Sequence, residues 1–270
     1  MLLVIAAHAA RLMRETHTAI GAHAASFFEH GGFGVDIFFA LSGYLICTLL
    51  LRERQHGSID LWAFYRRRFF RIIPPMAAYL AAIIALSGVG LVTLSHSEIA
   101  AVLLFCRNYV GGAWYTGHFW SLGVEEHFYI VVPLVLAFCS QRNALKIALA
   151  AALGCALIRL VEWKYLTGVE VEFRTEARFD TLMYGAMIAI ALQTPAWRAW
   201  IERRLTLSVA AAVLAVALIL LVAVPAMPAR RTVVALALPI LVAHTVLSPR
   251  SMAGRMLEAG WLRYIGRLSY

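Results

Sequence analysis

Long apolar stretches alternate with short polar stretches along most of the chain. Several of the apolar stretches approach the roughly 20 residues that a helix needs to cross a bilayer. This pattern predicts an all-α, polytopic integral membrane helical bundle with eight or nine membrane-spanning helices. The expected spans are 1–13, 33–51, 72–93, 119–138, 145–161, 177–194, 206–224 and 232–247, and a ninth begins near Arg263.

The composition supports a membrane protein over a soluble helical one. Of the 270 residues, 62% are hydrophobic and only 14% are charged, and the mean hydropathy is +0.77. A soluble domain is charged at about a quarter of its positions. No internal repeat, low-complexity tract or soluble linker interrupts the sequence, so we expect a single transmembrane domain over residues 1–270.

The positive charge of the chain, +9 at pH 7, is distributed unevenly. More than half of the basic residues fall in the stretches 52–71, 139–146, 195–205 and 248–267, which alternate with the others along the chain. Loops rich in Lys and Arg stay on the cytoplasmic side of a membrane. This rule accounts for the charge, so we expect no nucleic-acid partner, and we expect the loop 94–118 to face outward.

Both termini suggest that the domain is truncated. The first apolar stretch, of about 13 residues, would reach only about 20 Å as a helix, which is less than the roughly 30 Å of the hydrocarbon core. The chain stops at Tyr270, shortly after the aromatic and basic start of a further span at Trp261 and Arg263. We therefore expect a fragment, or a start codon placed late.

Three polar residues in the first two spans are candidates for chemistry. His8 is either a boundary histidine or a base for a hydroxyl nucleophile, since ionisable residues inside membranes are functional candidates. Asp36 either caps the start of its helix or orients His8, as a carboxylate orients the histidine of a hydrolase triad. Ser42 is more typical of close helix packing than of a nucleophile.

The arginine cluster that precedes Pro74 can be read in two ways. Arg66, Arg67, Arg68 and Arg71 are ordinary cytoplasmic anchors under the positive-inside rule. However, Arg68 and Arg71 are three residues apart and share one face if the segment is helical. Two guanidinium groups on one face suit a phosphate or pyrophosphate ligand.

Two further polar blocks lie inside apolar stretches. Glu125 is followed by a second glutamate and by His127, without the second histidine that metal-binding spacing requires, so we expect no metal. Arg178 and Asp180 open a later span, and we expect them to pair with each other or with the arginine cluster. Carboxylates and arginines inside a membrane segment are costly and need partners.

Together these blocks resemble the acyltransferase family 3 membrane proteins. The resemblance covers nearly the whole chain, and its specificity comes from five motifs in the right order. They are His8 after an apolar run, Gly34-Val35-Asp36-Ile37-Phe38-Phe39 with Leu41-Ser42-Gly43-Tyr44-Leu45-Ile46, Arg68-x-x-Arg71-Ile72-x-Pro74, Phe119-Trp120-Ser121-Leu122 with Val124-Glu125-Glu126 and Phe128-Tyr129, and Arg178-Phe179-Asp180-x-Leu182-x-x-Gly185.

This resemblance implies a ten-helix domain that moves an acyl group across the membrane. The donor would be cytoplasmic acyl-CoA, in particular acetyl-CoA, and the acceptor a hydroxyl of lipopolysaccharide, exopolysaccharide or a related glycan. The family's essential histidine corresponds to His8, and its Arg-x-x-Arg pair corresponds to Arg68 and Arg71. The family's arginine eleven residues before that histidine would precede Met1.

The expected function is therefore an O-acyltransferase of the bacterial inner membrane. We expect His8, Asp36 and Glu125 in catalysis, and Arg68, Arg71 and Arg178 in donor binding, with membrane lipid as surroundings. Transfer could proceed directly or through an acyl-histidine. The alternatives are a transporter or flippase for a lipid-linked sugar, for which no inverted repeat is evident, and a membrane scaffold, which would not require buried charges.

Overall fold

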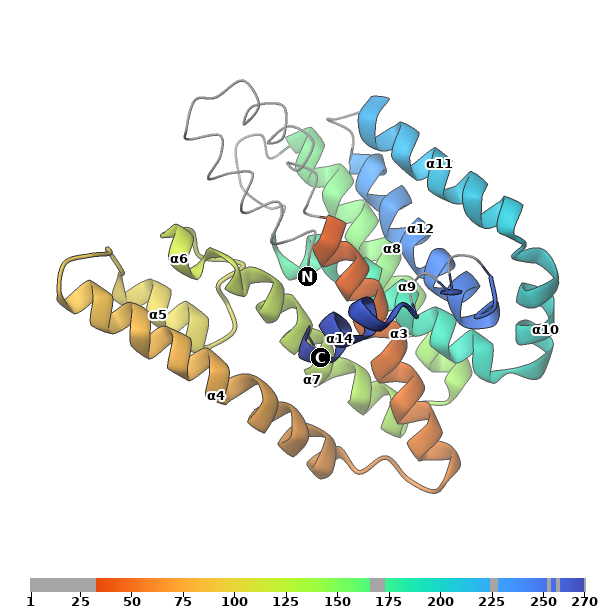
Figure 1. Cartoon of the computed structure of the whole chain (residues 1–270), viewed down its shortest axis with the longest axis horizontal. Coiled ribbons are helices and arrows are strands. Elements are labelled where there is room, and N and C mark those ends of the chain that lie inside the picture. Colours follow the sequence, from red (N-terminus) through yellow and green to blue (C-terminus); the bar gives the residue numbers. More distant parts are fainter. Residues whose placement is uncertain (1–32, 166–172, 224–227, 252–253, 256–257, 270) are drawn as a thin grey trace.

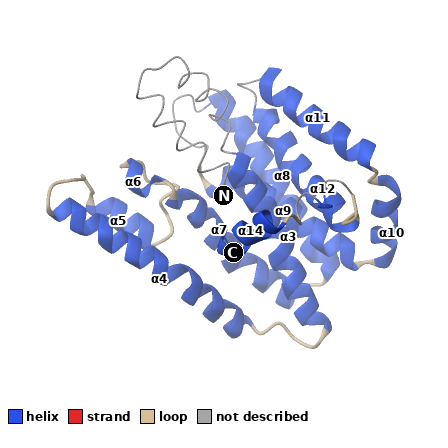
Figure 2. Ribbon diagram, in the orientation of Figure 1, coloured by secondary structure: helices blue, strands red, loops and turns tan. Residues whose placement is uncertain are grey.

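The computed structural model describes residues 33–165, 173–223, 228–251, 254–255 and 258–269, and within these ranges the chain forms helices and no strand (Figures 1 and 2). His8 and the expected first span lie outside the described residues. The helices are α3 Phe33–Gln55, α4 Leu61–Gly88, α5 His96–Leu103, α6 Trp114–Gly117, α7 Phe119–Phe138, α8 Gln141–Tyr165, α9 Thr175–Gln193, α10 Pro195–Arg204, α11 Leu207–Ala223, α12 Pro228–Leu247 and α14 Gly260–Ser269.

Helices α3 and α9 run parallel in the centre of the bundle. Asp36 and Arg178, near the starts of the two helices, form an ion pair, while Gln55 and Gln193 hydrogen-bond at their ends. The backbones approach closely because Gly43 packs against the carbonyl group of Leu182, where a Cβ would overlap the carbonyl oxygen. Small residues at such a contact allow two membrane helices to pack tightly.

Helices α7 and α8 complete the core around this pair. Arg54 of α3 donates hydrogen bonds to the carbonyl groups of Leu136 and Cys139, so the carboxyl ends of α3 and α7 lie together. Arg159, near the end of α8, donates to the carbonyl group of Ala177 at the start of α9, so α8 is antiparallel to α9. The α3–α4, α7–α8 and α9–α10 connections therefore lie at one end, called here the basic end.

The basic end carries cations from separate parts of the sequence: Arg52, Arg54, Arg142, Lys146, Arg198, Arg203 and Arg204. The structure thus groups three of the four stretches that the positive-inside rule assigned to one side of the membrane, namely those around the α3–α4, α7–α8 and α9–α10 connections. That this side is the cytoplasm stays a prediction.

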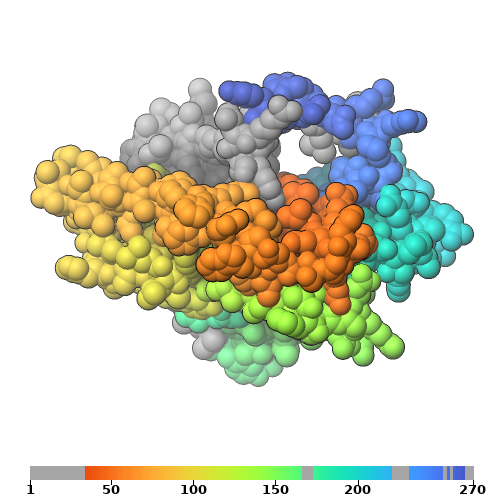
Figure 3. All heavy atoms as spheres, turned by 90° about the horizontal axis from the view of Figure 1, so that it is seen from below, coloured from red at the N-terminus to blue at the C-terminus, as the bar shows by residue number. Residues whose placement is uncertain are grey.

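Helices α4 and α5 extend away from the core as an arm, as Figure 1 and the space-filling view in Figure 3 show. A second, smaller apolar cluster joins this arm to α7 through Met76, Leu80, Val102 and Phe119. The arm is held by polar contacts as well, because the Tyr79 hydroxyl donates to the carbonyl group of Tyr115 at 2.8 Å.

The structure confirms part of the expected set of membrane spans. Among the described residues, four helices are long and apolar enough to cross a membrane: Gly34–Gln55, Leu61–Gly88, Trp114–Phe138 and Gln141–Tyr165. A fifth is obtained if Pro195–Arg204 and Leu207–Leu220, which are bent by 76°, are one broken span. A helix lies at each expected span after the first, although α4 begins 11 residues before the expected span 72–93. The count of eight or nine spans stays a prediction.

Two expectations about local structure are wrong. The stretches 52–71 and 195–205 were expected to be loops, but Pro195–Arg204 is the helix α10, and in 52–71 only the residues between Gln55 and Leu61 are non-helical. Helix α4 begins directly after Asp60, whose side chain accepts a hydrogen bond from the amide of Ala63 and caps the helix. The arginine cluster therefore belongs to a helix, and Arg68 and Arg71 share one face of it.

Candidate functional site

The two central helices hold a buried ion pair near their starts. An Arg178 amino group donates to Oδ1 of Asp36 at 2.9 Å, and both residues are at most 6% exposed. The Arg178 guanidinium also lies over the ring of Trp120 at 5.0 Å from its centroid. A buried arginine that is ion-paired and stacked in this way is fixed in position.

A second buried ion pair lies beside the first. Arg159 of α8 donates to the Asp180 carboxylate at 2.5 Å and to the hydroxyl of Thr232 at 2.8 Å. The expectation that Arg178 and Asp180 pair with each other, or with the arginine cluster, is wrong. The two residues are separated by about 200° around a helix, so they face different neighbours, α3 and α8.

The two pairs bring two buried arginines and two buried aspartates together near the starts of α3 and α9. The Nε–H groups of Arg159 and Arg178 are buried and have no hydrogen-bond partner in the described part of the chain. Buried donors without acceptors are costly, so this cluster is suited to an anionic or carbonyl oxygen.

Glu125 lies deeper in the bundle, between α7 and α3. Its Oε1 accepts hydrogen bonds from the Ser42 hydroxyl and from the Tyr129 hydroxyl, both at 2.6 Å. Ser42 and Glu125 are almost completely buried. The structure thus gives Ser42 a polar contact besides its place in helix packing, and it surrounds one carboxyl group with two hydroxyl groups.

Arg68 connects the arginine cluster to this carboxyl group. Its guanidinium lies over the ring of Tyr129 at 4.7 Å and near the ring of Phe64 at 5.7 Å. Arg71 is exposed on the same helix, and the positive charges of both arginines attract Glu125. Cations, a carboxyl group and hydroxyl groups therefore meet where α4 crosses α7.

The neighbours of Glu125 point elsewhere. One Glu126 oxygen is buried without a hydrogen-bond partner in the described chain, and the His127 ring lies 2.6 Å from the hydroxyl of Thr175. Consecutive helical residues are about 100° apart, so these side chains cannot converge on one ion. The described residues contain no group of three or more His, Cys, Asp or Glu side chains that could hold a metal ion.

The residues expected from the sequence thus form two groups. Asp36 and Arg178 lie together, and Glu125 lies with Arg68 and Arg71. Arg178 contacts Asp36 and Trp120 and is not part of the Arg68 group. His8 lies outside the described residues, so its distance to either group stays untested.

Sequence reasoning missed Arg159, which anchors the second ion pair. Its signal was available, because an arginine inside the expected span 145–161 is as costly as one at position 178. It also missed Tyr129 as the partner of Glu125 and Arg68. Tyr129 follows Glu125 by four residues, which places both on one helix face.

The comparisons with known proteins agree with these motifs. A family model described as an acyltransferase domain, acyltransferase 3, matches residues 1–270. The O-acetyltransferase OatA of Staphylococcus aureus strain NCTC 8325 / PS 47 is 30% identical over 204 residues, which cover 66% of this chain and 33% of OatA. OatA of strain MRSA252 gives the same values.

The chain therefore spans about a third of the length of the curated relatives that it matches. No solved structure matches it significantly. The family model, in contrast, extends over the entire sequence. The chain belongs to the acyltransferase 3 family and carries its acyltransferase domain.

Proposed function

We propose that this protein is an integral membrane O-acyltransferase of the bacterial inner membrane. It transfers an acetyl or another short acyl group from cytoplasmic acyl-CoA to a hydroxyl of a cell-surface carbohydrate, such as lipopolysaccharide or exopolysaccharide, or of its lipid-linked precursor. The family membership and the relatives named O-acetyltransferase support this reaction class. The observation that carries the proposal is the buried Glu125 carboxyl, bonded to two hydroxyl groups beside Arg68.

The donor binds where α4 meets the bundle. Arg68 and Arg71 lie three residues apart on one helix, so their guanidinium groups can hold the phosphates of acyl-CoA. The stack of Arg68 on Tyr129 presents its N–H groups in a fixed plane. The hydroxyl of Tyr129 in turn donates a hydrogen bond to Glu125. Phosphate binding at Arg68 is therefore coupled to the orientation of the Glu125 carboxyl group.

Transfer needs a base that takes the proton of the acceptor hydroxyl, and a hydrogen-bond donor that stabilises the oxyanion of the transition state. In this proposal His8 takes the proton of the hydroxyl, and Asp36 or Glu125 orients the imidazole. The hydroxyl oxygen bonds to the thioester carbon, the carbon–sulfur bond breaks, and the thiolate of CoA receives the proton. An acyl-histidine intermediate would divide the same transfer into two steps.

Arg178 acts at the acyl end of the donor. Its pair with Asp36 occupies one amino group, which leaves the buried Nε–H group available for a carbonyl oxygen. Positive charge aimed at an oxygen that becomes negative in the transition state accelerates acyl transfer.

Donor binding is tested with Arg68→Ala and Arg71→Ala. Each replacement should weaken acyl-CoA affinity by about 1.5–3 kcal/mol, the value of a hydrogen bond to a charged group. Arg67→Ala is the matched control, because Arg67 is exposed on the same helix. Arg54 is unsuitable as a control, since it donates hydrogen bonds to the carbonyl groups of Leu136 in α7 and of Cys139 directly after it. Equal affinity of the wild type and the double variant would refute the phosphate role.

The reaction is tested in proteoliposomes supplied with acetyl-CoA and a glycan acceptor. The wild type should release free CoA thiol only when the acceptor is present, whereas a transporter would release none. Glu125→Gln keeps the size of the side chain and should lower the rate of acyl transfer on the order of 10²-fold or more. His8→Ala should have an effect of the same size. Both variants should bind acyl-CoA with the affinity of the wild type. Rates are normalised to folded protein, and a change of only a few-fold would remove that residue from the mechanism.

A further inference from the structure

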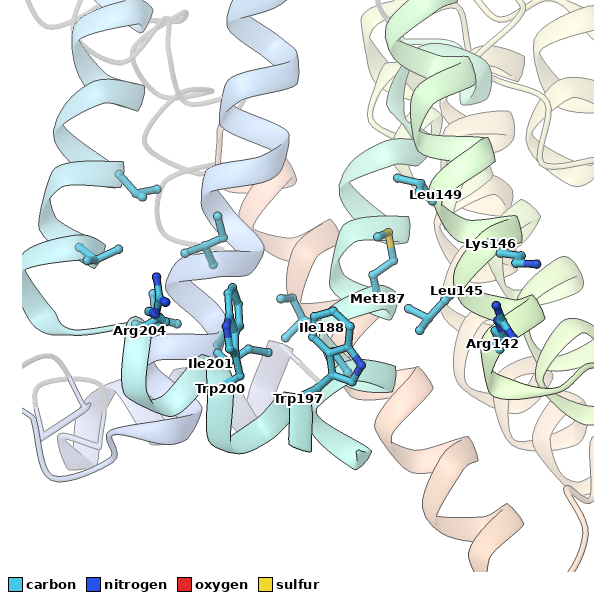
Figure 4. A pocket seen from close by; sticks show the side chains of 16 residues that line it. Arg142, Leu145, Lys146, Leu149, Met187, Ile188, Trp197, Trp200, Ile201 and Arg204 are labelled. Carbon is cyan, nitrogen blue, oxygen red and sulfur yellow. The ribbon is translucent and has the colours of Figure 1, made fainter. Parts of the chain in front are cut away.

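A large apolar groove opens at the basic end of the bundle, away from Glu125 and the two ion pairs. Its volume is about 670 Å³, and it lies between α8 and α9 on one side and α10, α11 and α12 on the other (Figure 4). Leu149, Met187, Ile188 and Ile201 are among the side chains that line it. Walls of this kind favour a hydrocarbon chain over a water-soluble ligand.

Three cations border the groove. Arg142 and Lys146 lie on the first turns of α8, four residues apart on one face, and Arg204 lies at the end of α10. Figure 4 shows Arg142 and Lys146 on one side of the groove and Arg204 on the other. None of the 16 residues that line the groove is acidic. An anion at the mouth would therefore meet positive charge from both sides.

The position of α10 places this mouth at a membrane surface. Helix α10 is bent by 76° from the apolar helix α11 that follows it, and it carries Trp197 and Trp200 together with basic residues. Tryptophan and arginine gather at the boundary between lipid and water. Both tryptophan rings lie between the two sets of cations in Figure 4.

From this arrangement we infer that the groove binds an anionic phospholipid of the leaflet at the basic end. One acyl chain lies along Leu149, Met187 and Ile201, and the phosphate lies between Arg204 and the pair on α8. Charge complementarity selects this occupant, because a neutral lipid or an apolar protein segment would leave the three cations without a counter-ion. Basic residues near a cytoplasmic membrane surface attract anionic lipids in the same way.

The inference is tested by native mass spectrometry of the full chain released from vesicles of phosphatidylcholine and phosphatidylglycerol. We expect the wild type to retain phosphatidylglycerol in preference to phosphatidylcholine. The triple variant Arg142→Gln, Lys146→Gln, Arg204→Gln should lose that preference. The ratio of retained phosphatidylglycerol to phosphatidylcholine should fall about fivefold for each cation removed. The matched control is Arg52→Gln, Arg66→Gln, Arg67→Gln, which removes the same charge from exposed positions outside the groove.

A further variant tests the chain site itself. Leu149 lines the groove and is 43% exposed, so Leu149→Trp should block the groove without disturbing the core, and bound phosphatidylglycerol should fall. Equal losses in the two triple variants would mean a general attraction of charge and would overturn the inference. So would undiminished phosphatidylglycerol in Leu149→Trp, or a wild type that retains both lipids equally.

Discussion

Helices α9 and α4 differ in what surrounds them, although both lie in apolar parts of the sequence. Twelve of the 19 residues of α9 are buried, including Arg178 and Asp180, whereas only four of the 28 residues of α4 are buried. The charged groups of α9 must therefore be paired inside the protein. The arginines of α4 are half-buried or exposed, so they can reach water or a ligand. The buried charges of α9 therefore hold helices together, whereas the arginines of α4 face outward.

The strongest test of this difference breaks the buried pair. Asp36→Ala leaves the Arg178 guanidinium buried without its partner, which should lower the free energy of unfolding by about 3–5 kcal/mol. The double variant Asp36→Ala, Arg178→Met removes both charges and should be destabilised less than the single one. Thermal unfolding in detergent measures both. If the single variant were the more stable of the two, the pair would not be what fixes α3 against α9.

The close approach of α3 and α9 predicts a smaller effect. Gly43→Ala places a Cβ against the Leu182 carbonyl and should cost about 1–3 kcal/mol through forced separation of the helices. Gly154→Ala on α8 is the matched control, because nothing beyond its chain neighbours and the backbone of its own helix lies within 4 Å of a Cβ there in the described chain. That replacement should stabilise the protein by roughly 0.5–1 kcal/mol, the helical preference for alanine. Thermal unfolding in detergent measures both variants. Similar changes in the free energy of unfolding for Gly43→Ala and Gly154→Ala would contradict the close packing of α3 against α9.

The arm of α4 and α5 should respond to acid locally. Burial opposes ionisation of Glu98, but hydrogen bonds from the amides of Ser95 and Ala113 and from the hydroxyls of Ser95 and Thr116 outweigh it and lower the pKa of this carboxyl below 4.5. A lowered pKa in the folded state means that its stabilisation is present above pH 4.5 and is lost as the pH falls through the folded value.

Proteolysis of the segment 104–113 measures this effect. Cleavage should rise as the pH falls below 4.5, and Glu98→Gln should give the same rise already at neutral pH, because the amide accepts fewer of these hydrogen bonds. Glu202→Gln, at an exposed position of α10, is the control. A cleavage rate that does not depend on pH would show that Glu98 does not hold this loop.

The smallest effect is expected at a surface pair. Arg198 and Glu202 form an ion pair at 3.0 Å on α10, with both side chains about half exposed. Arg198→Ala should change the free energy of unfolding by about 0–1 kcal/mol, because water and salt screen exposed charges. Unfolding curves of this variant beside those of Asp36→Ala compare a screened pair with a buried one directly. A cost similar to that of Asp36→Ala would remove the distinction between the two regions.

The sequence by itself determined that the long apolar segments are helical and which residue types matter. Span 119–138 was expected at the bounds that α7 has, since the length of an apolar run and its polar flanks are local properties. The shared face of Arg68 and Arg71 followed from their spacing alone. The family resemblance followed in the same way, because its motifs are short and ordered along the chain.

Only the tertiary structure decided the partners. Asp36 and Arg178 are 142 residues apart, and their contact exists because α3 and α9 pack in parallel through glycines. Arg159 meets Asp180 because α8 returns beside α9, and Arg54 binds the end of α7 because two helix ends coincide. The hydropathy pattern indicates that a charged residue lies in a membrane segment and therefore needs a partner. Which partner it finds depends on the packing of distant helices, which local patterns do not encode.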